Sequence, residues 1–200
     1  MRKKDVVVLL SGGLDSTVAA ASALAAGSLR ACLCVRYGQP HMEAEMMAAR
    51  KWCTDNVVER VLLDVNMPRV EAMHTGVGMA GPRVMPGRNL VLIAHAVQWA
   101  AANDCATVLI GACKDDAANY PDCRPKFVEA ANALASVYGV EVRAPWLYHT
   151  KADVVEFARI FKVDIAATWS CYEPLAVGFG FAPCGTCDAC RLRDAAVPRG

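Results

Sequence analysis

Apolar runs and helical patterns alternate along this chain, and this alternation restricts the fold more than any other feature of the sequence. The first run, Val6 to Leu10, is continuously apolar, which is typical of a strand buried on both faces. A glycine turn leads from it into an alanine-rich helical pattern, Thr17 to Ala26, which Gly27 ends. Strands that alternate with helices favour an α/β fold with a parallel sheet covered by helices on both faces.

The same pattern repeats to residue 160. The further predicted strands are Arg30–Tyr37, Val57–Val65, Thr107–Gly111 and Val140–Ala144. The further predicted helices are His41–Thr54, Leu90 to about Asn103, one that opens at Pro125, and one that Thr150 and Asp153 cap. A Met-, Gly- and Pro-rich loop, Asn66–Gly87, lies between the third strand and the third helix. Because 55% of the 200 residues are apolar and no repeat occurs, we expect one domain over residues 1–200.

Charge and hydropathy exclude several partners. The chain mixes 21 basic with 20 acidic residues, for a net charge of +1, so we expect neither a nucleic-acid groove nor a membrane surface. The start, Met1 to Lys4 followed by apolar residues, imitates a secretion signal, but the apolar run is short and breaks at Ser11. No segment approaches the ~18 uninterrupted apolar residues of a membrane span. We therefore expect a cytoplasmic protein that acts on small molecules.

In parallel sheets of this kind, ligands bind beyond the carboxyl ends of the strands. The segments that fall at this edge are Ser11–Ser16, Tyr37–His41, Ala112–Arg124 and Trp146–Lys151. We expect the functional site there.

The string Ser-Gly-Gly-Leu-Asp-Ser at residues 11–16 has the outline of a phosphate-binding loop but lacks the lysine of a Walker loop. A strand, a tight glycine turn and a helix start together present backbone N–H groups to an anion. The loop also carries Asp15, whose carboxylate is a natural partner of Mg²⁺. The loop therefore suits gripping the pyrophosphate end of ATP during attack on the α-phosphate; the alternative is an ordinary strand-to-helix turn. The predicted ATP-binding residues are Leu10, Ser11, Gly12, Gly13, Leu14, Asp15, Ser16 and Thr17.

Four of the ten cysteines crowd the end of the chain. Cys171, Cys184, Cys187 and Cys190 are separated by twelve, two and two residues, a spacing that lets four thiolates surround one ion. We predict a structural zinc segment over residues 168–193, in which Arg191 and Arg193 offset part of the thiolate charge. The alternative is an iron–sulfur cluster, but the ferredoxin pattern would continue with Cys-Pro, which is absent here.

The remaining cysteines fall into two groups. Cys32, Cys34, Cys53 and Cys105 lie in apolar, periodic segments and are predicted to be core residues. Cys113 and Cys123 lie in a polar loop, and the sequence does not decide their role.

Six strings in this order resemble the QueC family of 7-cyano-7-deazaguanine synthases, which belongs to the PP-loop ATP pyrophosphatases with the adenine nucleotide alpha hydrolase-like fold. They are Ser11–Ser16, Tyr37–Gln39 with His41 and Glu43–Glu45, Pro86–Leu90, Tyr120–Pro125, Leu147–Lys151, and Thr168–Tyr172 with the terminal cysteines. The resemblance implies ATP-dependent conversion of 7-carboxy-7-deazaguanine and ammonia into 7-cyano-7-deazaguanine, with Mg²⁺, a structural zinc and a homodimer.

Roles for individual residues follow from this chemistry as predictions. Asp15, on a loop expected to be exposed, and Asp116 would hold Mg²⁺, and Lys151 would contact phosphate unless it is a solvated surface lysine. The predicted substrate-binding residues are Arg88, Asn89, Tyr120, Asp122 and Arg124. A carboxylate accepts from the two adjacent N–H groups of a guanine edge, which favours Asp122, whereas a guanidinium holds the substrate carboxylate. Asp122 and Arg124 could instead pair with each other.

Other functions remain open at this stage. A PP-loop enzyme for tRNA-base thiolation would carry a persulfide on Cys113 or Cys123, and the usual asparagine of the family is replaced at Cys113. A related synthase-like protein could act in DNA modification or defence, and the segment Leu175–Phe181 is unusually hydrophobic. A nucleotide-binding module without catalysis would not require the intact loop.

Overall fold

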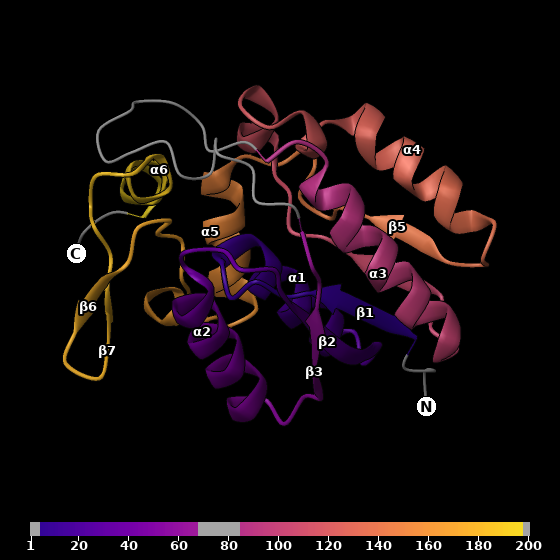
Figure 1. Ribbon diagram of the computed structural model, residues 1–200, viewed down its shortest axis with the longest axis horizontal. Coiled ribbons are helices and arrows are strands. Elements are labelled where there is room, and N and C mark those ends of the chain that lie inside the picture. Colours follow the sequence, from indigo (N-terminus) through magenta and orange to yellow (C-terminus); the bar gives the residue numbers. More distant parts are fainter. Residues whose placement is uncertain (1–4, 68–84, 198–200) are drawn as a thin grey trace.

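A computed structural model describes residues 5–67 and 85–197 and has a parallel sheet of five strands at its centre (Figure 1). The strand order is β3-β2-β1-β4-β5, and every neighbouring pair is parallel. The strands are β1 Val6–Leu9, β2 Leu29–Arg36, β3 Arg60–Asp64, β4 Thr107–Leu109 and β5 Glu141–Arg143. Because β1 lies between β2 and β4, the order of the strands reverses beside it, which is where ligands bind in such sheets.

Helices cover both faces of this sheet, as the sequence predicts. The helices are α1 Leu14–Ala25, α2 Met42–Asp55, α3 Arg88–Ala102, α4 Pro125–Ser136, α5 Lys151–Ile160 and α6 Asp188–Ala196. One apolar core joins the sheet to α1, α2 and α5, and a second core on the other face joins it to α3 and α4. Val7 and Val8, adjacent in β1, are fully buried in opposite cores, because successive side chains of a strand point to opposite faces. The α/β prediction is confirmed.

The observed elements differ from the predicted ones mainly at their ends. Helix α1 begins at Leu14, three residues earlier than predicted, because Gly13 adopts the extended conformation of an N-cap directly before it. Strand β3 begins at Arg60 rather than Val57, whose φ of 54° is left-handed and belongs to a turn. The predicted cap of α5 is present as a capping box between Thr150 and Asp153. Most of the predicted loop, 66–87, lies outside the described residues.

Several elements near the end of the chain were not predicted, among them helix α6 and a hairpin. In the hydrophobic segment, β6 (Leu175–Val177) and β7 (Gly180–Ala182) form a two-stranded antiparallel hairpin that extends away from the sheet beside α6 (Figure 1). Phe179 at its tip is fully exposed. Within the described residues, short 3-10 helices also occur at Lys114–Ala118, Pro121–Cys123 and Ile165–Ala167.

The cysteines outside the C-terminal segment are buried. Cys32, Cys34, Cys53 and Cys105 are core residues, as predicted, and all ten cysteines are free thiols. No helix in the two described ranges is long and apolar enough to cross a membrane.

Candidate functional site

The phosphate loop follows β1 at the sheet edge and is shaped by a very close approach of the chain to α2. Gly12 has a φ of +83°, and a Cβ atom there would lie 2.6 Å from the carbonyl oxygen of Glu45 and 2.9 Å from the amide nitrogen of Ala49. Both the conformation and the lack of space require glycine at this position. The loop is therefore held rigidly against the helix beside it.

Hydroxyl groups fix the inside of the loop. The Ser16 Oγ donates to the carbonyl oxygen of Gly13 at 3.1 Å, and Thr17 Oγ1 donates to the same oxygen at 2.8 Å. Ser11 Oγ lies 3.1 Å from Ser16 Oγ. Thr17 is 2% exposed, so it supports the turn from the interior of the protein.

A cavity of about 250 Å³ opens in front of this loop. Of the predicted ATP-binding residues, six line it and two, Gly12 and Thr17, do not. The six are Leu10, Ser11, Gly13, Leu14, Asp15 and Ser16. Gly111 at the end of β4 also lines the cavity, and a Cβ atom there would lie 2.6 Å from the Ser16 amide nitrogen. The absence of a side chain at Gly111 thus allows the chain after β4 to pack directly against the loop backbone.

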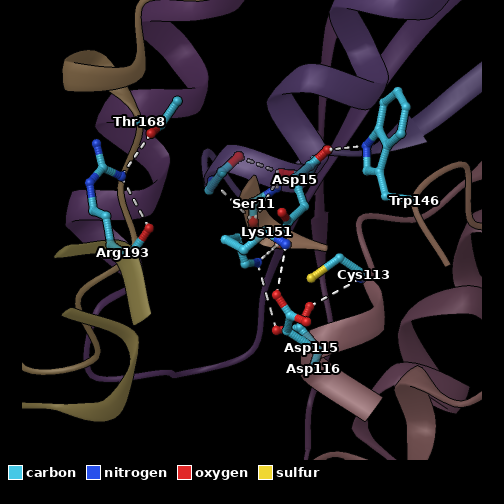
Figure 2. Close-up of polar contacts among 12 residues, drawn as sticks. Ser11, Asp15, Cys113, Asp115, Asp116, Trp146, Lys151, Thr168 and Arg193 are labelled. Atoms are coloured by element: carbon cyan, nitrogen blue, oxygen red, sulfur yellow. Dashed lines mark hydrogen bonds and ion pairs between the residues drawn. The ribbon is translucent and has the colours of Figure 1, made fainter. Parts of the chain in front are cut away.

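The cation that the loop sequence lacks comes from α5 (Figure 2). Lys151 Nζ lies 2.5 Å from Asp15 Oδ2 and 3.7 Å from Asp116 Oδ1, and all three side chains are between 15% and 17% exposed. The expectation that Asp15 lies on an exposed loop is wrong, because α1 begins one residue before it and Trp146 covers its backbone, donating from Nε1 to the Asp15 carbonyl at 3.0 Å. The alternative considered for Lys151, a solvated surface lysine, does not apply, because its side chain is only 15% exposed.

Two carboxylates, Asp15 and Asp116, share the single ammonium of Lys151 in this cluster. Burial raises the pKa of Asp15 above its usual value, although Lys151 opposes the shift. Burial lowers the pKa of Lys151, but Asp15 and Asp116 raise it more, so the ammonium keeps its proton. Asp15 Oδ1 is buried and has no hydrogen-bond partner, which is costly unless a ligand supplies one.

The carboxylates of Asp115 and Asp116 accept hydrogen bonds from different parts of the backbone. Asp115 Oδ2 accepts from the backbone N–H of Lys151 at 2.7 Å and so fixes the start of α5. Asp116 Oδ2 accepts from the backbone N–H of Cys113 at 3.1 Å (Figure 2). Ligand atoms of Asp15, Cys113 and Asp116 lie within 4.8 Å of one another, so the group could hold a metal ion.

Aromatic and polar side chains line the half of the cavity away from the loop. Of the predicted substrate-binding residues, Arg88, Asn89 and Tyr120 line it. Asp122 and Arg124 do not: Asp122 Oδ2 accepts from the backbone N–H of Asn89 at 3.4 Å, and the exposed Arg124 donates to the Ala117 carbonyl at 3.0 Å. Asp122 and Arg124 therefore contact different partners.

Sequence reasoning gave no role to several residues that the fold brings to this half of the cavity. They are Tyr37, Gln39, His41, Glu45 and Tyr172. The Tyr120 and Tyr172 hydroxyls lie 3.3 Å apart, and the rings of His41 and Tyr172 lie 5.4 Å apart between centroids. The available signal was their position in two of the six strings, one at the end of the second strand and one before the cysteines.

The four C-terminal cysteines meet as predicted. Their sulfur atoms lie within 4.8 Å of one another. Backbone N–H groups of Glu173 and Cys184 donate to the Cys171 sulfur at 3.3 and 3.2 Å, and those of Thr186 and Cys187 donate to the Cys184 sulfur at 3.5 and 3.4 Å. Such donors stabilise thiolates, so the segment fits a metal ion with four sulfur ligands.

The two arginines that follow have different surroundings. Arg193 donates to Thr168 Oγ1 at 2.8 Å and to Ser170 Oγ at 3.1 Å (Figure 2), and it lines the cavity. Arg191 lies at the surface, 3.9 Å from Asp188. Arg193 therefore ties α6 to the segment that leads into the first cysteine.

Cys113 and Cys123 are both buried, at 0% and 8% exposure. Burial raises the pKa of the Cys113 thiol to about 12 and raises that of Cys123 as well. Protonated, enclosed thiols are poor nucleophiles, which argues against a persulfide carrier at either position.

Comparisons with known proteins agree with the site. The family model "Queuosine biosynthesis protein QueC" matches residues 5–199. The chain is 38% identical to the 7-cyano-7-deazaguanine synthase of Microcystis aeruginosa, over 97% of this chain and 91% of that protein. It is 39% identical to the enzyme of the same name from Synechococcus elongatus, over 96% of this chain and 89% of that protein.

Solved structures show the same fold at low identity. NMN synthetase from Francisella tularensis aligns with a TM-score of 0.55 and 17% identity, over 86% of this chain and 68% of that one. The U34-tRNA thiolase NcsA from Methanococcus maripaludis, solved with its [4Fe-4S] cluster, aligns with a TM-score of 0.54 and 15% identity, over 95% and 80%. At these identities the likeness shows the fold alone.

Proposed function

The chain belongs to the QueC family of queuosine biosynthesis proteins, and on that premise we propose that it is an ATP-dependent 7-cyano-7-deazaguanine synthase. Its substrates are 7-carboxy-7-deazaguanine, ammonia and ATP. The match over residues 5–199 carries this proposal. The cavity supports it, because one end offers a phosphate loop and the other offers aromatic rings and Arg88.

The chemistry explains why one nucleotide site is enough. A carboxylate does not react with ammonia, because oxide is a poor leaving group. Attack of a carboxylate oxygen on the α-phosphate of ATP releases pyrophosphate and gives an acyl-adenylate, from which ammonia displaces AMP to form the amide. Attack of the amide oxygen on a second ATP, followed by loss of AMP and protons, leaves the nitrile.

The loop and its cluster would bind the leaving pyrophosphate. Backbone N–H groups at the start of α1 would bind an anion, and the Lys151 side chain lines the same cavity beside Asp15. The unpartnered Asp15 Oδ1, with Asp116 close by, fits Mg²⁺, which would neutralise charge on the phosphates when bound. Lys151 then replaces the Walker lysine from another element of the fold.

The substrate ring would lie at the aromatic end. We assign Tyr120 and Arg88 to it because both line this part of the cavity, and the Arg88 guanidinium would hold the substrate carboxylate by two parallel N–H donors. Asn89 lies at the same wall, whereas a direct role for Asp122 and Arg124 stays a prediction.

The cysteine site would hold zinc and no substrate. With four protein sulfurs around the ion no position is left for a reactant, so this metal is structural. We further propose that the protein is a cytoplasmic homodimer and that its nitrogen donor is free ammonium.

Pyrophosphate release by the purified protein tests the proposal. Release should require 7-carboxy-7-deazaguanine, ammonium and Mg·ATP together, and the product should be the nitrile by mass spectrometry. Glutamine in ammonia-free buffer should not replace ammonium. Pyrophosphate release that is indifferent to the deazaguanine would refute the assignment.

A further inference from the structure

Glu45, in the first turn of α2, is a carboxylate in the aromatic half of the cavity to which the proposed reaction gives no role. It lines the cavity, and its side chain is 15% exposed. Burial raises the pKa of its carboxyl to about 7, although a hydrogen bond from Gln39 and the charge of Arg88 oppose the shift. A buried acid at a cavity wall is expensive unless it binds something there.

The two oxygens of this carboxylate have different contacts. Oε2 accepts from Gln39 Nε2 at 3.0 Å, and the same amide nitrogen donates to the Val35 carbonyl at 3.3 Å. Oε1 lies 3.6 Å from His41 Nε2, beyond the length of a normal hydrogen bond. The carboxylate is thus oriented by Gln39 and keeps acceptor capacity on the side of the cavity.

Its position relative to the phosphate loop is fixed by the backbone. The carbonyl oxygen of Glu45 is the atom nearest to the missing Cβ of Gly12, at 2.6 Å. Any shift of this turn of α2 would therefore move against the loop itself. A ligand held by Glu45 is consequently held at a set distance from the bound phosphates.

The groups around Glu45 suit a flat heterocycle that carries no positive charge. Tyr37, Tyr120 and Tyr172 offer aromatic surfaces at the same cavity, and Arg88, which is hydrogen-bonded to Tyr37, offers a cation for an acidic substituent. A guanine-type ring carries two adjacent donors, N1–H and the 2-amino group, and a carboxylate can accept from both.

We propose that Glu45 is the residue that recognises the guanine edge of the substrate, while Arg88 holds the carboxylate at the opposite side of the ring. This inference rests on the proposed function and names the specificity determinant of that same site. It predicts selection for 2-amino purine analogues, because removing the amino group removes one of the two hydrogen bonds from the ring to the carboxylate, and a 2-oxo group would face the carboxylate with another acceptor.

Calorimetry tests this with a thermodynamic cycle. The affinities of the native protein and of Glu45→Gln are each measured for the substrate and for its analogue without the 2-amino group. The native protein should bind 7-carboxy-7-deazaguanine about 10- to 100-fold more tightly than the analogue that lacks the 2-amino group. Glu45→Gln should lose that preference, binding both compounds with similar weak affinity, and should bind Mg·ATP within about twofold of the native protein. Glu43→Gln, an exposed acid on the same helix, is the matched control and should behave as the native protein.

The cycle also separates this inference from its rivals. If the preference for the 2-amino group survives in Glu45→Gln, or disappears instead in Asp122→Asn, the assignment of Glu45 is wrong. A Glu45→Gln protein that melts at a much lower temperature is replaced by Glu45→Asp, which keeps a carboxylate but withdraws it, and which should lose part of the preference; full retention there overturns the inference. A native protein that binds the deazaguanine but releases no pyrophosphate would contradict the proposed function. The binding measurements would still test the role of Glu45 in that case, because they require no turnover.

Discussion

The phosphate-loop cluster and the cysteine segment are both charged, partly buried groups of metal-binding residues, but they are assembled in opposite ways. Asp15, Asp116 and Lys151 come from three elements distant in sequence, and only the folded sheet edge brings them together. The four cysteines come from one short stretch, and their sulfurs are supported by backbone N–H groups of that same stretch. The first site therefore depends on the whole fold, whereas the residues of the second come together within one stretch of the chain.

The two regions touch at the loop. The backbone N–H of Trp169, two residues before the first cysteine, donates to the Gly12 carbonyl at 2.8 Å. Arg193 in α6 reaches back to Thr168 and Ser170. Loss of the metal should thus loosen one wall of the cavity as well as the segment itself.

The largest expected effect is on stability and comes from the cysteine segment. Cys187→Ser should remove a zinc ligand, and in zinc peptides the ion contributes roughly 10 kcal/mol to folding, so the free energy of unfolding should fall by several kcal/mol. Melting followed by circular dichroism, with metal content measured by mass spectrometry, checks this. Metal-free protein that melts at the native temperature would contradict the structural role, and a brown, iron-containing protein would contradict zinc.

The next effect is on turnover and comes from the loop cluster. Asp15→Asn keeps the shape of the side chain but removes the charge that Lys151 and Mg²⁺ share, so pyrophosphate release should fall about 10²- to 10³-fold. Its melting temperature should change far less than that of Cys187→Ser. Near-normal turnover with Mg²⁺ would show that Asp15 is not a metal ligand, and equal losses of stability in the two variants would end the distinction between the regions.

A smaller effect concerns pH and the buried Glu45, whose turn of α2 packs against the phosphate loop. The pKa of Glu45 is about 7 when folded against a reference value of 4.5, so the folded state binds the extra proton between these values. The stability that this proton supplies is complete below the reference pKa and is lost as pH rises through 7. The native protein should therefore lose about 2 kcal/mol of unfolding free energy relative to Glu45→Gln between about pH 5.5 and pH 8. Urea melts of the two proteins that run parallel across this range would refute the raised pKa.

The smallest effect is expected at Asp122. Its carboxylate faces the amide at the start of α3, where a negative charge stabilises a helix by about 0.3–1 kcal/mol. Asp122→Asn should therefore lower stability slightly and leave the affinity for the deazaguanine unchanged. A loss of ~1–3 kcal/mol in substrate affinity, with ATP affinity unchanged, would instead restore the sequence-based assignment.

Much of the fold and one of the two metal-binding regions could be predicted from the sequence. The five strands, the coverage of both faces and the meeting of the four cysteines follow from local patterns, namely apolar runs, caps and two-residue spacing. The short strands β4 and β5 ended earlier than predicted, because apolar residues continue past the last paired residue, as at Ile110. The β6–β7 hairpin was missed because its strands have only three residues each and leave their apolar side chains exposed.

The cavity was harder to predict because its walls are set by tertiary packing. The sequence around Lys151 is typical of a surface lysine in the first turn of a helix. Its side chain is buried against Asp15 only because α5 packs against α1. Glu45 reads as one of two similar acids in the first turns of α2, and only the contact of that helix with Gly12 shows which of the two faces the cavity. Asp122 was favoured by its position in a polar loop, which gives no information on the direction of its side chain.

Counting products per turnover tests the central claim most directly, namely that one loop cluster activates the substrate twice at the α-phosphate. With 7-carboxy-7-deazaguanine, ammonium and Mg·ATP, the native protein should release two pyrophosphates and two AMP for each nitrile formed, and Asp15→Asn should slow both steps together. Release of ADP and phosphate, or a single pyrophosphate per nitrile, would contradict the account.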